Sequence, residues 1–246
     1  TGGLIGEIYT SSVTNVSVRP LTPASEISVS NGTVGGIVGL SQDSSINDVY
    51  SNINIHATAQ AVYLGGIAGF DRIVDESART QTELVYEGDI TSLYAGSGTC
   101  GGIIGAGDQK IDGASVEGST ITCSGIPMVG LLGYASKTES NDKVIDVFLE
   151  VAHPDDIPSG VVGGIVGYWN STTNGDYVIE GNTFVGTIET VSVNAGLAAF
   201  IVILDLNETS SITFSRNIVR ATFQNGNAAG GLLGTLVSDG DEDAND

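Results

Sequence analysis

A short apolar sequence between glycines returns eight times along this chain and constrains its fold more than any other feature. Its clearest copy is Gly35-Gly36-Ile37-Val38-Gly39, and we call each copy a glycine pulse. Aligning the copies on the second glycine gives steps of 33, 30, 36, 28, 34, 32 and 35 residues. Repetition at a nearly constant step indicates a repeat architecture. The pulses begin at Gly2, Gly35, Gly65, Gly101, Val129, Gly163, Ala195 and Gly230.

A β-solenoid is the repeat architecture that this sequence favours. Ankyrin and tetratricopeptide repeats have a similar length, but they are helical, and paired glycines disfavour helix. The leucine-rich and nonapeptide calcium-binding patterns are absent. We therefore predict an all-β fold, a β-solenoid (β-helix) of about seven to eight coils with a repeat of about 33 residues. Residues 1–237 are expected to form this single domain, and residues 238–246 an acidic tail or linker.

Between the pulses, Val, Ile, Thr, Tyr and Phe fall near alternate positions, which is typical of strands. Each coil should contribute two or three short strands, stacked about 4.8 Å from those of the next coil. The paired glycines should either turn a corner with positive φ or allow close backbone approach. Strands are expected at 13–18, 49–55, 84–90, 114–121, 144–151, 178–185 and 212–219. Interior rows are expected at Ile37, Val38, Ile67, Ile103, Ile104, Leu131, Leu132, Ile165, Val166, Leu197, Leu232 and Leu233.

Acidic side chains dominate the charge of the chain. It has 29 Asp and Glu against 8 Lys and Arg, for a net charge of −21. Nucleic acids and anionic membrane surfaces bind clustered cations, so this composition excludes them as partners. The charge suits a soluble surface protein, a saline medium or calcium binding. The most apolar run, residues 196–204, is too short to insert across a membrane.

The two cysteines, Cys100 and Cys123, leave two alternatives open. They either form one disulfide, which would close a loop of about 24 residues and contribute about 3 kcal/mol, or remain two free buried thiols. The chain has neither an initiator Met nor a basic leader. We therefore expect it to be a mature or excised segment of a longer precursor.

The pulse and the strand that follows it resemble the GLUG repeat, which has a Gly-Gly-Leu-Val-Gly-like core. The resemblance extends from Gly2 to Gly234 and is best in the second repeat, from Gly35 to Tyr50. The pulse at Ala195 departs most, because it lacks the first and last glycines. This family is found in large secreted, adhesin-like surface proteins. The resemblance therefore implies a β-solenoid with an adhesive or scaffolding role and without catalytic residues.

Catalytic residues are not expected from the residues themselves either. The two histidines, His56 and His153, lie in different repeats, and no nucleophile elbow, phosphate loop or zinc spacing occurs. We therefore predict that the protein is not an enzyme and needs no cofactor. A pair of carboxylates on one face remains an alternative, as in β-helical polysaccharide lyases and hydrolases. The candidates for such a pair are Asp75, Glu76, Asp146, Glu150, Asp155 and Asp156.

Two further features concern ions and modification. The tail at 239–246 has alternating Asp and one glycine, like the start of a calcium loop, but it lacks that loop's later glycine and Glu. A disordered acidic linker is favoured, and calcium remains the alternative. Asn-x-Ser/Thr sequons, which permit N-glycosylation, occur at Asn15, Asn31, Asn170 and Asn207. Asn170 and Asn207 are expected in outward loops, whereas Asn15 falls in a predicted strand.

These features together predict a secreted or cell-surface protein with a structural or adhesive role. The ends of a solenoid expose unpaired strand edges, which invite pairing. We expect either end-to-end self-association into a filament or continuation by further repeats of a longer chain. Surface glycans are a further candidate partner. The rival hypothesis is a carbohydrate-binding or carbohydrate-degrading β-helix, which a cleft lined by aromatic side chains would favour.

Overall fold

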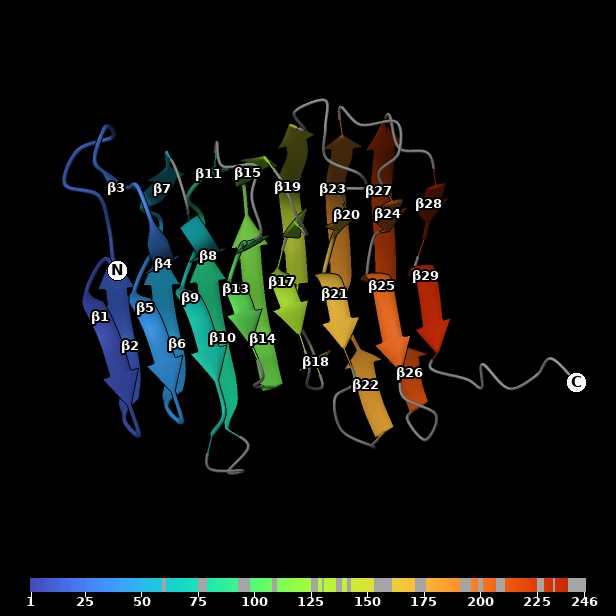
Figure 1. Ribbon diagram of the computed structural model, residues 1–246, viewed down its shortest axis with the longest axis horizontal. Helices are drawn as coiled ribbons and strands as arrows, with labels where there is room; N and C mark the ends of the chain where they lie inside the picture. Colours follow the sequence, from blue (N-terminus) through green and yellow to red (C-terminus); the bar gives the residue numbers. More distant parts are fainter. Residues whose placement is uncertain are drawn as a thin grey trace, which may run out of the picture.

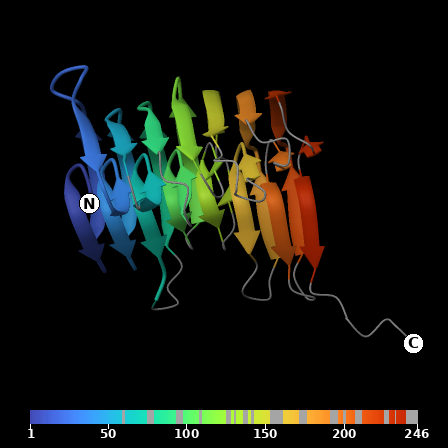
Figure 2. The same cartoon turned by 45° about the horizontal axis from the view of Figure 1, so that its top comes forward.

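The computed structural model describes residues 1–58, 61–74, 79–92, 98–107, 110–124, 128–129, 131–135, 139–140, 143–152, 161–170, 176–190, 196–198, 201–206, 211–224, 228–231 and 233–238. These residues form a β-solenoid of parallel strands, as the glycine pulses predicted. In Figure 1 the strands run across the long axis, and successive coils follow one another along it. Figure 2 shows the same succession after rotation. No helix in the described part is long and apolar enough to cross a membrane.

The first sheet begins within each glycine pulse and contains eight strands. Neighbouring strands pair in parallel, and Ile5 pairs with Val38, 33 residues later. In order along the molecule the strands are β1 (Ile5–Tyr9), β5 (Val38–Gln42), β9 (Ala68–Arg72), β13 (Ile104–Gly107), β17 (Leu132–Ala135), β21 (Val166–Asn170), β25 (Ile201–Leu206) and β29 (Leu233–Ser238).

The second sheet leads into each pulse after the first and has seven strands. They are β4 (Gly32–Gly35), β8 (Ala61–Gly65), β12 (Thr99–Gly101), β16 (Met128–Val129), β20 (Val161–Gly163), β24 (Gly196–Ala198) and β28 (Ala228–Gly230).

The third and largest sheet has 14 strands in two arms. The first arm holds β2 (Ser12–Val18), β6 (Ser45–Ser51), β10 (Thr80–Tyr86), β14 (Lys110–Glu117), β18 (Glu139–Ser140), β22 (Asp176–Glu180) and β26 (Ser211–Ser215). The second arm holds β3 (Glu26–Val29), β7 (Asn54–Ala57), β11 (Ile90–Ser92), β15 (Thr120–Ser124), β19 (Lys143–Ala152), β23 (Thr183–Thr190) and β27 (Ile218–Gln224). The two arms join at β19, which pairs with β14 through its first residues and with β15 through its last.

The interior consists of columns of apolar side chains, with one residue from each coil. The register of the second arm of the third sheet shows this directly, because it aligns the side chains of Ile27, Ile55, Ile90, Ile121, Ile188 and Phe223. The predicted rows of pulse residues are also interior. This holds for every member between the two end coils whose side chain is described. The completely or almost completely buried members are Ile37, Val38, Ile67, Ile103, Ile104, Leu131, Leu132, Ile165 and Val166.

The paired glycines serve close approach rather than positive φ. A Cβ on Gly36 would lie 2.1 Å from the carbonyl oxygen of Gly66 in the next coil. The same test on Gly66 gives 2.1 Å to the carbonyl oxygen of Gly102 and 2.3 Å to Cγ of Tyr86. A side chain at these positions would therefore push neighbouring coils apart, because stacked strands lie only about 4.8 Å from each other.

In the repeats whose bend is described, positive φ instead falls at the bend of the large sheet. The register places these left-handed residues in one column, because the strands pair on both sides of them. Four of the positions are occupied by residues other than glycine, which rarely adopt this conformation. The column contains Asn15, Asp48, Glu83, Gly113, Gly181 and Arg216, with φ values from 52° to 76°.

Strand boundaries differ from the sequence expectation in two respects. Four strands, not two or three, connect one pulse to the next, as β5 to β8 do. Five of the predicted strands therefore span two: 49–55, for example, covers the end of β6 and the start of β7. The corner residues lie inside those predicted runs. Gly118 and Gly181 adopt positive φ there, which turns the chain although the β-branched pattern continues.

The seventh pulse was misaligned by three residues. The register pairs Ala198 with Gly163 and Gly230, and Ile201 with Val166. The pulse therefore begins at Ala198 rather than Ala195, and Leu197 belongs to the preceding strand, β24. The sequence pattern placed the pulse at Gly196 because that residue is a glycine, but the pairing of the strands determines the register. Leu232 lies outside the described residues, and the side chain of Leu197 is not described.

Candidate functional site

The N-terminal end of the solenoid exposes side chains that are interior elsewhere. Leu4 occupies the first apolar position of its pulse and is 56% exposed. The residues at the same position in the next two coils, Ile37 and Ile67, are completely buried. Ile5 and Ile27, which head two interior columns, are only partly buried. Among the described residues, no other coil covers the apolar face of this first coil.

The C-terminal end is open in the same way. Phe223 and Val219 end two interior columns and are only partly buried, whereas Ile188 and Phe184 in the preceding coil are completely buried. Leu233, which ends a third interior column, is also only partly buried, whereas Val166 in the same column is completely buried. The solenoid thus has two apolar ends, which we call the N-face and the C-face.

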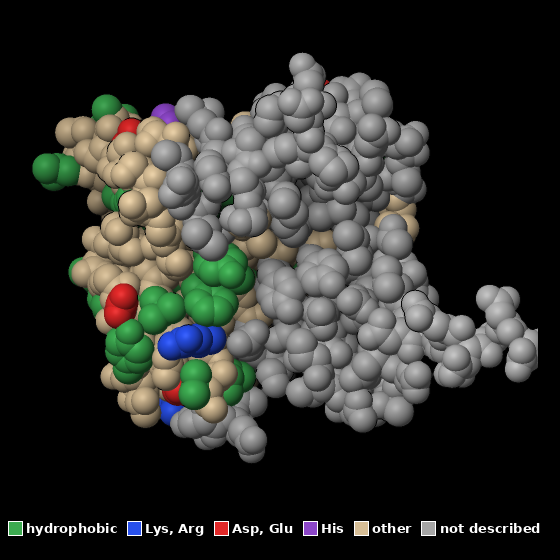
Figure 3. All heavy atoms as spheres, in the orientation of Figure 1, with side chains coloured by type: hydrophobic (Ala, Val, Ile, Leu, Met, Phe, Trp, Pro, Cys, Tyr) green, Lys and Arg blue, Asp and Glu red, His purple; other side chains and the backbone are tan. Residues whose placement is uncertain are grey.

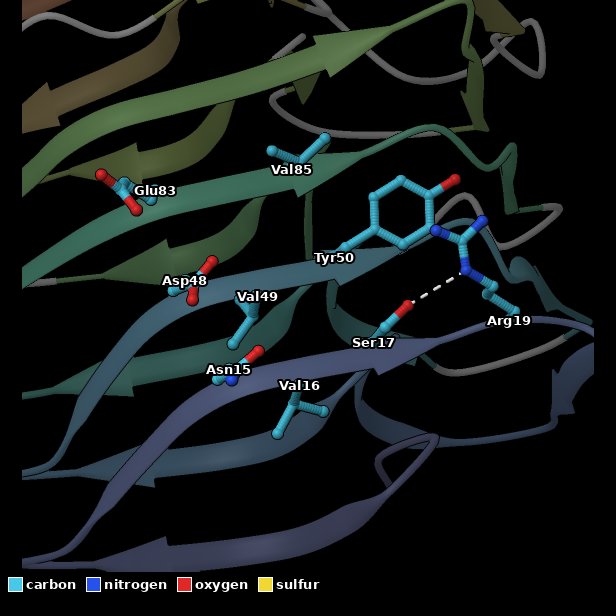
Figure 4. A pocket seen from close by; sticks show the side chains of 9 residues that line it. All are labelled: Asn15, Val16, Ser17, Arg19, Asp48, Val49, Tyr50, Glu83 and Val85. Atoms are coloured by element: carbon cyan, nitrogen blue, oxygen red, sulfur yellow. Dashed lines mark hydrogen bonds between the residues drawn. The ribbon is translucent and has the colours of Figure 1, made fainter.

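A groove of about 370 Å³ crosses β2, β6 and β10 on the outer face of the large sheet. This volume lies within the range of ligand pockets. Each of these strands supplies one left-handed residue, and Figure 4 shows the side chains of Asn15, Asp48 and Glu83 in a row across neighbouring strands. The groove is lined by Asn15, Val16, Ser17, Arg19, Asp48, Val49, Tyr50, Glu83 and Val85.

Arg19 and Tyr50 form the other side of the groove. The Arg19 guanidinium lies 4.1 Å from the centre of the Tyr50 ring, a cation–π contact, and Arg19 Nε donates to Ser17 Oγ at 3.1 Å. The Tyr50 hydroxyl donates to Glu87 Oε2 at 2.5 Å. Burial raises the pKa of Tyr50, and the hydrogen bond to Glu87 raises it further. The Tyr50 ring is therefore held in place, with one face covered by a cation.

Asp48 and Glu83 occupy equivalent positions in adjacent coils, because Asn47 pairs with Thr82 and Val49 with Leu84. Two exposed carboxylates one strand spacing apart repel each other. Together with the Asn15 amide they present a row of hydrogen-bond acceptors, which suits hydroxyl groups. Sequence reasoning missed this row because it depends on register. The signal that could have revealed it is a pair of consecutive polar residues, such as Asn47-Asp48, which interrupts the alternation of apolar and polar residues in the strand.

A buried polar cluster lies at one interior corner and is structural. Gln81 is completely buried in a column that holds Ile46 and Ile111 in the neighbouring coils. Its amide nitrogen donates to Asp71 Oδ2 at 3.0 Å and to the carbonyl of Ser44 at 2.9 Å. Its oxygen accepts from the backbone of Ile46. The amide therefore replaces its lost hydration with internal bonds.

A disulfide joins Cys100 to Cys123. Cys100 lies in β12, in a column with Val34 and Leu64, and Cys123 lies in β15 beside Ser92. Both cysteines are buried, so the bridge crosses the interior and ties one coil to the next.

The six carboxylates proposed as candidates for a pair have no described side chains, so the pairing stays a prediction. Asp75, Glu76, Asp155 and Asp156 lie outside the described residues, as do His153 and the tail 239–246. Asp146 and Glu150 lie in β19, and their side chains are not described. His56 lies in β7, with Nδ1 4.0 Å from Glu26 Oε1. Among the described residues, no three His, Cys, Asp or Glu side chains are grouped as metal ligands would be.

The sequons differ in their surroundings. Asn31 is exposed just before β4. Asn15 lies in β2 as predicted, but it is exposed at the left-handed bend. Asn170 was expected in a loop and is instead the last residue of β21, because this strand begins within the pulse and continues beyond it. Asn207 lies outside the described residues.

Comparison with known proteins gives one distant relationship. No protein-family model matches the chain, and no solved structure matches it significantly. A protein named halomucin, from Haloquadratum walsbyi, is 28% identical over 183 residues, which cover 71% of this chain. The chain spans only 2% of the length of halomucin, so this relative is many times longer.

Proposed function

We propose that this chain is a structural segment of an extracellular surface protein, a β-solenoid of seven to eight coils extended by stacking on further coils. The observation that carries this proposal is the pair of open apolar ends. Leu4 is 56% exposed although its counterparts are fully buried. Apolar side chains and unpaired strand edges are unfavourable in water and are satisfied by one more coil. The role requires no catalytic residue and no cofactor.

An extracellular location is supported by three features. The Cys100–Cys123 disulfide is of a kind that persists in oxidising compartments. The relative carries the name of a mucin, and mucin-like stalks are glycosylated surface structures. The net charge of −21 keeps a protein soluble where salt screens repulsion. Asn31, Asn170 and Asn207 remain candidate glycosylation sites.

An adhesive role is the finer part of the proposal. It rests on the resemblance of the pulses to the GLUG repeat of adhesin-like proteins. In such a role the solenoid acts as a stiff spacer, because each coil is fixed by those beside it. The covering coil can come from further repeats of a longer chain or from a second copy of this chain.

The test is the size of residues 1–246 as a function of concentration in concentrated salt, by analytical ultracentrifugation. We expect reversible end-to-end association that Leu4→Asp reduces at least tenfold, because it places a charge on the N-face. Val74→Asp is the control, since Val74 is similarly exposed at 60% but lies away from both ends. A monomer at all concentrations, or equal effects of both variants, would contradict stacking through the ends.

A second candidate function is saccharide binding in the groove. The groove favours it because acceptors from Asn15, Asp48 and Glu83 lie beside a fixed aromatic ring. Calorimetric titration with neutral and uronic-acid oligosaccharides tests this function. Binding should be lost in Asp48→Ala and kept in Glu117→Ala, which removes an exposed carboxylate of the same sheet outside the groove. If no oligosaccharide binds at millimolar concentration, the groove has no such role.

A further inference from the structure

At the C-face, the last pulse has free space at the position where internal pulses contact the next coil. Inside the solenoid, a Cβ on the second glycine of a pulse would meet the next coil's glycine carbonyl at 2.1 to 2.2 Å, as at Gly3 and Gly36. Gly231 is the second glycine of the last pulse, and a Cβ there would meet nothing within 4 Å. Gly231 therefore has open space where the second glycines of the internal pulses face the glycine of the next coil.

We infer that the C-face of one copy binds the N-face of a second copy in the register of the internal coils, with Gly231 against Gly3. This inference rests on the proposed function and specifies the partner. The hydrogen bonds have a direction, because Gly3 N donates to Gly35 O at 3.1 Å and Gly36 N donates to Gly65 O at 3.2 Å. By the same rule, Gly231 N donates to Gly2 O of the second copy.

The interior columns fit this junction. The paired registers carry Leu233 along its column to Ile5. They carry Phe223 to Ile27 in the same way. In the junction the first residue of each pair covers the second, and all four are only partly buried in the single copy. Apolar residues thus meet apolar residues in both columns.

A shift of the register by one residue is disfavoured by the two-residue period of the strands. A slip by one residue would turn Phe223 outward and bring Gln224 over Ile27, which places a polar side chain on an apolar column. The in-register junction does place Arg220 in the column of Arg19 on the outer surface. Both arginines are exposed, so salt screens this repulsion, and the junction tightens as ionic strength rises.

The test is a disulfide across the junction. Gln224 and Ser28 are exposed and end the same column, so the register places them side by side in different copies. Stacked Cα atoms about 4.8 Å apart are within the range of a disulfide. Their strands, β3 and β27, lie towards opposite ends of one copy, so a bridge cannot form within it (Figure 1). The variant Ser28→Cys/Gln224→Cys should oxidise to a ladder of covalent multimers that a reductant dissolves.

The control is Ser28→Cys/Ser215→Cys, because Ser215 lies in β26, in the other arm of the sheet. We expect at least tenfold less cross-linking from this pair under the same conditions. Multimers that cross-link equally in both variants would overturn the register while leaving end-to-end stacking intact. Absence of association in the parent chain would overturn both the register and the proposed function.

Discussion

The pulse at the N-terminal end and the pulses inside the solenoid have nearly the same sequence but different surroundings. Leu4 is 56% exposed, whereas Ile37 and Ile103 are completely buried at the same pulse position. The difference arises from the neighbours, because each coil of a solenoid contacts only the coils beside it. Burying a leucine is worth about 1.5–3 kcal/mol, so each end lacks part of what an internal coil gains. Stability here belongs to the stack rather than to the single repeat.

The glycines show the same contrast in the backbone. Gly66 lies so close to the next coil and to the Tyr86 ring that no side chain fits, whereas Gly231 has open space around it. On the face drawn in Figure 3, hydrophobic side chains are visible over the N-terminal strands, and few basic side chains accompany them.

The largest difference in unfolding free energy is expected between a charge placed in the interior and a charge placed at the N-terminal end. Ile103→Asp buries an unpaired carboxylate and should cost at least about 4 kcal/mol of unfolding free energy. Leu4→Asp should change the unfolding free energy of the dilute monomer by no more than about 0.5 kcal/mol, since the site already faces water. Urea unfolding of both variants measures the difference. Equal losses would show that the first coil is covered within this chain.

Removal of the disulfide should have the next largest effect. Cys100→Ala/Cys123→Ala should lower the unfolding free energy by about 3 kcal/mol, because the bridge closes a loop of about 24 residues. The two coils that the disulfide joins should be destabilised most. Amide exchange should accelerate in β12 and β15 and stay unchanged in β1, which gives the internal comparison within one sample.

Replacing a glycine by alanine should also have different effects inside the solenoid, at Gly66, and at its C-terminal end, at Gly231. Gly66→Ala should cost about 1–3 kcal/mol through overpacking against the carbonyl of Gly102. Gly231→Ala should leave the stability of the dilute monomer unchanged but weaken end-to-end association. Thermal unfolding and sedimentation of both variants test the pair. A stability loss in Gly231→Ala would mean that its surroundings are already filled.

The smallest effect should appear at alkaline pH. Burial raises the pKa of Tyr86 well above that of a tyrosine in the unfolded chain, which is about 10. The folded state therefore holds its proton when the unfolded state has lost it, so the contribution is present below pH 10 and is lost above it. Tyr86→Phe should flatten this alkaline loss. At neutral pH it should cost about 1 kcal/mol through the hydroxyl's bonds to Ile53 and Asp89.

The sequence predicted the fold class because its strongest pattern, the glycine pulse, lies where the coils touch. Rows such as Ile37 and Ile67 followed from that pattern alone. The bends did not, because Asp48 and Glu83 take left-handed conformations that usually mark glycine. The groove was missed for the same reason, since residues 35 apart become neighbours only through register. The seventh pulse was misplaced because Ala198 replaces the glycine that marks it elsewhere.

Amide exchange of residues 1–246 over a concentration series tests the central claim most directly. Dilute protein should exchange rapidly in β1 and β29 and slowly in β9 and β13, because only the inner strands have coils on both sides. Concentrated protein should gain protection in β1 and β29 together, with β9 unchanged. Slow exchange in the end strands at every concentration would contradict the account, because it would show that the ends are covered without a further coil.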